Sequence, residues 1–201
     1  RSKNSIWEML EKIEKGCFRA RDFNQKLLTF AAENPPLTEK TDIPELFSSI
    51  KLPAVDNPSV KYLINTQESV WSVDIDRSQI RTSIGKILDN SVQAMPSGGF
   101  ITISFSNIIM DVNNTLLLDP GRYVRIQIQD DGTGIPLAYQ DKIFEPFFTT
   151  KQKGAGLSLA FCYCSLKRHN GTITVESEEG VGSVFSLYLP ASKPSCLGSE
   201  V

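Results

Sequence analysis

The residues with the most evident chemical potential follow a predicted strand at residues 123–129. Apolar side chains alternate along that segment and share one face, and Asp130 continues the same face. A carboxylate on the core side of a strand costs free energy unless it finds a partner. The turn that follows contains Gly132 and Gly134, which allow a ligand to approach the backbone closely. A recessed acceptor beside such a turn suits the amine of an adenine ring, although a solvated turn acid would give the same pattern.

A second group of residues, Gly154, Ala155, Gly156 and Leu157, opens a predicted helix at residues 157–167. Free backbone N–H groups and the positive end of the helix dipole would make this a phosphate-binding position. Taken alone, the same pattern belongs more often to a loop than to a ligand site. No Gly-Lys-Ser/Thr sequence follows it, which excludes a P-loop, and the third glycine of a Rossmann fingerprint is missing.

Asn90 lies on a predicted helix at residues 80–95, in a polar stripe with Lys86 and Gln93 at spacings of four and three. The amide oxygen of Asn90 could hold Mg²⁺, which binds few protein ligands and keeps much of its water. An ordinary surface asparagine is the alternative for this residue taken alone.

Residues 143–151 place three phenylalanines between the two glycine-containing segments. Such aromatic residues could belong to an ordinary core. In a mobile segment they could instead dock and undock as a lid over a bound nucleotide. Lys151, at the end of the segment, would then supply a positive charge to the terminal phosphates.

Taken in this order, the segments 87–95, 130–136, 143–151 and 154–159 resemble the catalytic ATP-binding domain of two-component sensor histidine kinases. This family belongs to the ATPase superfamily that includes gyrase, MutL and chaperones, and the phenylalanine-rich segment distinguishes it from those relatives. The resemblance extends over residues 41–190.

The resemblance implies a role for each segment. Asp130 would bind the adenine amine, Asn90 would ligate Mg²⁺ between the phosphates, and Lys151 would reach the phosphates. Asn90 and Lys151 would thus be the catalytic residues. The implied nucleotide contacts are Asn90, Asp130, Gly132, Gly134, Ile135, Lys151, Gly154, Ala155, Gly156, Leu157 and Ser183. The implied lid side chains are Phe144, Phe147 and Phe148.

The resemblance also implies a function. ATP with Mg²⁺ would supply a γ-phosphoryl group to a histidine, for relay to an aspartate on the receiver domain of a response regulator. That acceptor histidine is absent from this chain, since its one histidine, His169, is predicted to cap the end of a helix. The chain is therefore expected to be part of a protein-histidine kinase and not to phosphorylate itself.

Two positions depart from the family pattern. Lys86 stands where an asparagine is usual, and Ser158 replaces the third glycine of the phosphate-binding segment. Lys86 could lend charge to a phosphate or repel Mg²⁺. These departures leave open a nucleotide-degenerate, non-enzymatic dimerisation and signalling module. An ATPase or a protein-serine kinase of the same fold is a further alternative.

The elements that must position these segments are strands and helices in a mixed order. Further strands are predicted as a hairpin at 60–65 and 70–75, singly at 100–105, and as a second hairpin at 172–176 and 183–189. A polar loop is expected at residues 106–120. This pattern favours an α+β fold, a two-layer α/β sandwich whose sheet is covered by helices on one face. The resemblance makes it a Bergerat-type ATP-binding fold with a mixed sheet, at residues 37–190.

Apolar residues at alternating spacings of three and four run through residues 1–32 and predict a long amphipathic helix. Such a helix could pack on its own domain, but its length favours a helix hairpin or a dimer. Residues 1–36 also resemble the second helix of the family's dimerisation and phosphoacceptor hairpin, which implies a homodimer in the full protein. Residues 191–201 are expected to form a C-terminal tail.

The charge balance excludes some partners. The chain has 21 basic and 23 acidic residues and a net charge of -2, which argues against a nucleic-acid partner or a polybasic membrane anchor. No apolar run reaches the about 18 to 20 residues that a membrane span needs, and the four scattered cysteines suggest a reducing compartment. We therefore expect a cytoplasmic chain without membrane contact, although the absence of an initiator methionine leaves room for a membrane-anchored full-length protein.

Overall fold

The computed structural model describes residues 36–53, 59–151 and 154–193. The predicted helix of residues 1–36 lies outside the described residues except for its last position, and so does the predicted tail beyond residue 193. Within the described part of the chain, no helix is both long enough and apolar enough to cross a membrane.

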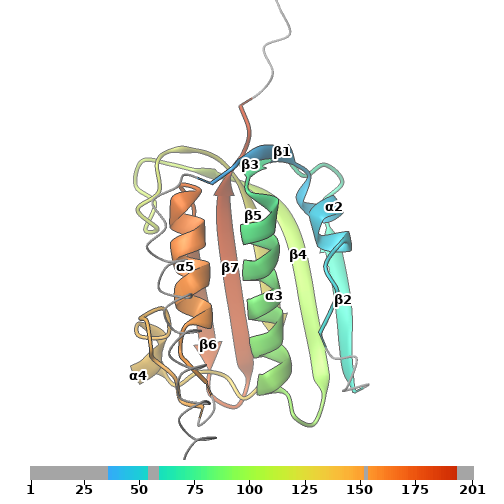
Figure 1. The fold of residues 1–201 in the computed structure, drawn as a ribbon, viewed down its shortest axis with the longest axis vertical. Coiled ribbons are helices and arrows are strands. Elements are labelled where there is room, and N and C mark those ends of the chain that lie inside the picture. Colours follow the sequence, from blue (N-terminus) through green and yellow to red (C-terminus); the bar gives the residue numbers. More distant parts are fainter. Residues whose placement is uncertain (1–35, 54–58, 152–153, 194–201) are drawn as a thin grey trace, which may run out of the picture. The chain divides into compact units, whose positions relative to one another are not determined.

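The domain is built on a five-stranded sheet with two long helices on one of its faces (Figure 1). The strands lie in the order β2-β4-β5-β7-β6, with β2 parallel to β4 and the other neighbours antiparallel. A small second sheet pairs β1 with β3. The elements are β1 (Glu39–Thr41), α2 (Ile43–Ser48), β2 (Val60–Thr66), β3 (Val73–Ile75), α3 (Arg77–Ala94), β4 (Gly99–Met110), β5 (Gly121–Asp130), α4 (Leu137–Gln140), α5 (Ser158–Arg168), β6 (Thr172–Glu178) and β7 (Gly182–Pro190). The mixed sheet and its helical layer confirm the predicted fold class.

The core lies between the sheet and the two long helices, α3 and α5. Alternate residues of β5, including Val124, Ile126 and Ile128, are fully buried, as expected for a strand with one covered face. Helix α3 contributes Ile84 and Leu88 to the same core. The apolar stripe of α3 therefore fixes which of its faces turns away from the sheet, and with it the direction of the polar stripe that contains the predicted site.

The predicted hairpin of residues 60–65 and 70–75 is wrong, because β2 pairs with β4 and β3 pairs with β1. A tight hairpin turn prefers glycine or asparagine, and the residues between these strands include neither. The connecting chain is instead held by Asn107 of β4. Its side chain accepts a hydrogen bond of 2.9 Å from the Trp71 backbone N–H and donates one of 2.6 Å to the Ser69 carbonyl. Long-range contacts with β4 thus decide the pairing.

The predicted polar loop at residues 106–120 is shorter than expected. β4 continues to Met110 and β5 begins at Gly121, and Met110 packs with Tyr123 in a small second apolar cluster. The remaining loop is ordered by Asn114, whose side chain makes three hydrogen bonds to backbone atoms of the loop. Polar residues are compatible with strands in this region, because the helices cover only one face of the sheet and the other face can carry polar side chains.

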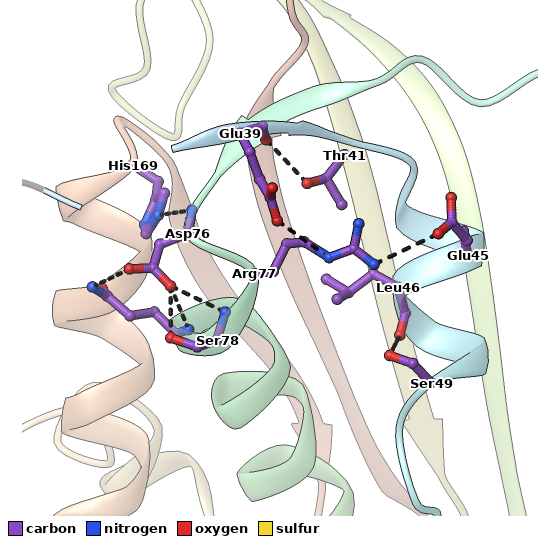
Figure 2. A network of polar contacts seen from close by, with 10 residues as sticks. Glu39, Thr41, Glu45, Leu46, Ser49, Asp76, Arg77, Ser78 and His169 are labelled. Atoms are coloured by element: carbon purple, nitrogen blue, oxygen red, sulfur yellow. Dashed lines mark hydrogen bonds and ion pairs between the residues drawn. The ribbon is translucent and has the colours of Figure 1, made fainter. Parts of the chain in front are cut away.

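The chain's single histidine joins the two long helices at one end (Figure 2). His169 is 5% exposed, and its Nε2 accepts a hydrogen bond of 3.0 Å from the backbone N–H of Asp76 at the start of α3. Its Nδ1 lies 2.7 Å from the Ser165 carbonyl on α5, so the ring is the neutral tautomer that carries its proton on Nδ1. The Asp76 carboxylate caps α3 by accepting from the N–H groups of Ser78 and Gln79. His169 therefore closes α5, as predicted, and also fastens α5 to α3.

We expect His169→Ala to lower the free energy of unfolding by about 1–3 kcal/mol, because it leaves the Asp76 N–H without its acceptor. Urea unfolding followed by circular dichroism measures this loss. Glu39→Gln is the control, since it removes an exposed ion pair with Arg77 at 3.5 Å, and such pairs contribute about 0–1 kcal/mol. Equal losses in the two variants would contradict the role assigned to His169.

Candidate nucleotide-binding site

A cavity of about 770 Å³ lies between the C-terminal end of α3, the N-terminal end of α5 and the turn after β5. The predicted site residues that line this cavity are Asn90, Asp130, Gly134, Ile135, Phe148, Lys151, Gly154, Ala155, Gly156 and Ser183. Lys86 and Ser158, the two departures from the family pattern, line it as well. The fold thus brings segments that are far apart in the sequence to one place.

Four predicted residues are not part of the cavity wall: Gly132, Leu157, Phe144 and Phe147. Leu157 is buried at the N-cap position of α5. The Phe144 ring packs against that of Tyr163 on α5, with 5.9 Å between the ring centroids. The Phe147 side chain is 49% exposed. Among the three predicted lid side chains, Phe148 is the one that lines the cavity.

Asp130 is 3% exposed, as its place on the core face of β5 predicts. Its Oδ2 accepts a hydrogen bond of 2.8 Å from the Ser91 hydroxyl, and its Oδ1 accepts one of 3.0 Å from the Gly132 N–H. Burial raises the pKa of this carboxyl above its ordinary value, while the hydrogen bonds from Ser91, Gly132 and Ser183 act in the opposite direction and the charge of Asp131 raises it further. Because each carboxylate oxygen accepts two hydrogen bonds, Asp130 keeps acceptor capacity for a donor on a ligand.

The glycine-containing turn after Asp130 is fastened to the end of the β6–β7 hairpin by Ser177. The Ser177 hydroxyl accepts a hydrogen bond of 2.8 Å from the Ile135 N–H and donates one of 2.7 Å to the Gly182 carbonyl. It also lies 2.9 Å from the hydroxyl of Ser183, which is the residue opposite Asp130 in the β5–β7 register. Since the Ser177 proton is already donated, Ser183 is the donor in this pair. Ser183 is thereby held in place beside the carboxylate.

The cavity wall also carries Asn90, on α3, and Lys151, in the segment before α5. The Lys151 Nζ lies 2.7 Å from the Gln93 side-chain oxygen and 3.5 Å from the Asn90 side-chain oxygen. Burial lowers the pKa of Lys151, because desolvation disfavours its charged form. The cation thus approaches α3 through two neutral amide oxygens, both of which belong to the polar stripe that includes Lys86. Its charge is not cancelled by either of these contacts.

The glycine-containing segment before α5 holds its shape through a conformation that requires glycine. Gly156 has a φ of +64°, and a Cβ on it would overlap the backbone carbonyl of Phe147. The Phe147 N–H in turn donates a hydrogen bond of 2.9 Å to the Gly156 carbonyl. The N-cap residue Leu157 makes no side-chain capping bond. The first turn of α5 therefore begins without a side-chain cap, beside the cavity, which suits an anionic ligand.

Sequence reasoning missed the residues that support the predicted ones. Ser91 lies on the apolar face of its helix, where a buried serine needs a partner, and that signal could have pointed to Asp130. Gln93 was recognised in the polar stripe but not as the partner of Lys151. Ser177 carries no signal in the sequence, because its role depends on where β6 ends relative to a distant turn.

Substitutions of three glycines should separate the free-energy cost of a positive φ from the cost of a steric overlap with the added Cβ. Gly134→Ala should lower the free energy of unfolding by about 2–4 kcal/mol, because its φ of +66° is strained for alanine and a Cβ would overlap the Glu178 carbonyl. Gly180→Ala, with a φ of +82° but open space, should cost about 1–2 kcal/mol. Gly85→Ala, within α3 and also in open space, should stabilise by about 0.5–1 kcal/mol. Denaturant unfolding of the three variants checks this order, and any other order would contradict it.

The raised pKa of Asp130 predicts a pH dependence of stability. Because the folded protein holds this proton to higher pH than the unfolded chain, the free energy of unfolding should fall as pH rises from 3.8 through the folded-state pKa. Above the folded-state pKa, Asp130 is charged in both the folded and the unfolded chain, so the full free-energy cost of burying the charge lowers the stability. The stability of Asp130→Asn relative to the parent should therefore increase with pH and then level off. Urea unfolding of both proteins over a pH series measures the difference, and a difference independent of pH would rule the effect out.

Comparison with known proteins agrees with this geometry. Residues 75–193 match the family model described as histidine kinase-, DNA gyrase B-, and HSP90-like ATPase. The chain is 32% identical over 185 residues to the sensor kinase CckA of Brucella abortus, an overlap of 89% of this chain and 20% of CckA. It is 36% identical over 120 residues to sporulation kinase C of Bacillus subtilis, covering 60% of this chain and 25% of that protein. The chain thus spans a quarter or less of the length of these relatives.

A solved structure shows the same fold. The catalytic domain of histidine kinase ThkA, in a nucleotide-free form, superposes with a TM-score of 0.62 at 26% identity, over 77% of this chain and 95% of that domain. The family match covers the helices and strands that surround the cavity, from the start of α3 to the end of β7. The chain therefore belongs to the family of histidine kinase-, DNA gyrase B-, and HSP90-like ATPases, and its domain is an ATP-binding catalytic domain of the sensor histidine kinase type.

Proposed function

We propose that residues 37–190 bind ATP together with Mg²⁺ and supply the γ-phosphoryl group to a histidine that is not part of this chain. The observation that carries the proposal is that one cavity is lined by two chemically different sets of groups. The wall of the cavity combines a buried carboxylate acceptor, Asp130, with the start of α5, which has no side-chain cap, and with Lys151 and Asn90. These two kinds of group match the two chemically distinct ends of a nucleoside triphosphate.

At the base end, Asp130 accepts a hydrogen bond from the amine of adenine. The hydrogen bonds from Ser91 and Gly132 help to hold the carboxylate in position before a ligand arrives. Ser183 donates to Ser177 and therefore presents acceptor lone pairs near the base. Such a set of acceptors favours a ring with an exocyclic amine over one with a carbonyl at that position.

At the phosphate end, the first turn of α5 and the glycine-containing segment offer backbone N–H groups, and Lys151 offers a cation. The described residues contain no group of three or more His, Cys, Asp or Glu side chains that could hold a metal ion alone. A single amide oxygen, from Asn90, fits Mg²⁺, which is commonly held by one or two protein ligands together with phosphates and water. When bound, Mg²⁺ would neutralise charge on the phosphates, and the protein's part is to position them.

The segment with Phe144, Phe147 and Phe148 serves as a lid in this proposal. The Phe148 ring lies 5.5 Å from that of Tyr139, between ring centroids, and both residues line the cavity. Closure of such a segment over the triphosphate would exclude water from the transfer step. Lys151 follows the lid in the sequence, so that movement of the lid and delivery of the cation are linked.

The acceptor of the phosphoryl group lies elsewhere in the proposed assembly. His169 is buried and hydrogen-bonded through both ring nitrogens, so it is unsuited as an acceptor, and the isolated chain is not expected to phosphorylate itself. Residues 1–36 would be the second helix of the dimerisation and phosphoacceptor hairpin of a homodimer, and residues 191–201 a C-terminal tail. The phosphorylated histidine would then feed an aspartate on a response-regulator receiver domain in the cytoplasm.

A thermal melt with and without ATP and Mg²⁺ tests the proposal. Ligand at a hundredfold excess over its dissociation constant should stabilise the folded chain by about 2.7 kcal/mol and raise the melting temperature. Asp130→Asn should abolish the shift, because it replaces an acceptor by a donor at the adenine amine.

Asp131→Asn is the matched control, since this neighbouring acid accepts a hydrogen bond from the Phe100 N–H at 3.2 Å and does not line the cavity. It should keep the full shift. A parent chain that shows no shift would overturn the proposal and favour a nucleotide-degenerate signalling module. If both variants lost the thermal shift equally, the loss could not be assigned to Asp130 specifically.

A further inference from the structure

Lys86 belongs to the polar stripe on α3, and the proposed mechanism gives it no task. It precedes Asn90 by four residues, and both side chains line the same cavity. Residues at this spacing lie one above the other on a helix face. The family resemblance leads us to expect an asparagine here, so the lysine adds a positive charge one turn away from the proposed Mg²⁺ ligand.

The ammonium group of Lys86 reaches across to α5. Its Nζ lies 5.5 Å from the centroid of the Phe161 ring. Phe161 lies one turn after Ser158, the first residue of α5, and its N–H donates to the Leu157 carbonyl in the opening turn of that helix. Lys86 therefore places its charge beside the start of α5, where the proposed phosphate site lies.

Lys86 forms no ion pair with a carboxylate within the described residues, in contrast to Arg77, which lies 3.5 Å from Glu39 and 3.6 Å from Glu45. Asp89 lies three residues away and lines the cavity too, but it forms no ion pair with Lys86. A cation that rests over an aromatic ring is held weakly and remains available to an anion. Lys151 also lines the cavity and contacts the neutral amides of Asn90 and Gln93, so the side chains of two cations belong to one cavity wall.

The positive charge of Lys86 could act on a bound metal ion or on a bound phosphate, and these two effects have opposite signs. Two positive charges close to Asn90 would repel a divalent cation, whereas they would attract the terminal phosphates of a nucleotide. We propose that Lys86 is a phosphate-binding residue of this chain, and that it reduces the dependence of ATP binding on Mg²⁺. The proposal rests on the proposed function, because it assumes that a nucleoside triphosphate occupies the cavity.

The test compares ATP binding to the 201-residue chain with saturating Mg²⁺ and with EDTA in place of the metal, by isothermal titration calorimetry. Lys86→Asn restores the residue expected from the family. It should weaken metal-free ATP binding by about tenfold, the size of one charge-assisted hydrogen bond. Binding in the presence of Mg²⁺ should change much less, so the ratio of the two dissociation constants should increase. Lys86→Arg should stay near the parent in both conditions.

Lys167→Asn is the matched control. Lys167 also rests over an aromatic ring, that of Tyr163, at 5.5 Å, but it does not line the cavity. It should leave both dissociation constants unchanged. Lys86→Gln serves as a second variant if thermal melts without nucleotide show that Lys86→Asn does not fold.

Three results would overturn the assignment. If the parent binds ATP and Lys86→Asn binds it equally well in EDTA, Lys86 makes no phosphate contact and the proposed function stands without it. If Lys86→Asn binds more tightly with Mg²⁺ and unchanged in EDTA, the lysine acts by repelling the metal. A parent chain that binds no ATP in either condition would reject the proposed function together with this inference.

Discussion

A buried carboxylate that has no cationic partner among the described residues is the constraint on which the rest of the site depends. Asp130 ends a strand whose inward face is otherwise apolar, and water no longer solvates it. The free-energy cost of such a group is acceptable only when hydrogen bonds replace the lost water. Ser91 and Gly132 supply two of them from different elements. Helix α3 and the turn after β5 are therefore both tied to one side chain, in the part of the cavity proposed to hold the base.

The same constraint explains the crowding of glycines around this strand end. A Cβ on Gly132 would stand 2.6 Å from a carboxylate oxygen of Asp130, and one on Gly182 would overlap the Asp130 carbonyl. Bringing donors and backbone this close leaves no room for side chains. Elsewhere in the cavity wall, Lys86 and Lys151 have long charged side chains that start from α3 and from the segment before α5. The surroundings of Asp130 are thus crowded and offer neutral donors, whereas the two lysines bring positive charge to the wall.

Much of this could be predicted from local patterns, and the failures have physical causes. The two long helices, β5 and the β6–β7 hairpin follow from periodicity, because each buries a continuous apolar face. The pairing of β2 was mispredicted, since a strand's partner depends on contacts such as that of Asn107 with Trp71, which no local pattern encodes. Among site residues, Asp130 and Asn90 could be proposed from the order of the motifs along the chain, although neither is distinctive when taken alone. Ser177 and Gln93 matter only through a partner brought near by the fold.

The parallel pairing of β2 with β4 also makes α3 a crossover connection. In antiparallel neighbours a short turn can bring two strands together, but parallel neighbours meet only after the chain between them has crossed the sheet. Residues 67–98, which include all of α3, form that crossing. The edge strand of the sheet therefore has its place only when the helix that carries Asn90 is packed. If α3 loosened from the sheet, the edge strand β2 would lose its place and the cavity would lose part of its wall. The site and the edge strand therefore unfold as one cooperative unit.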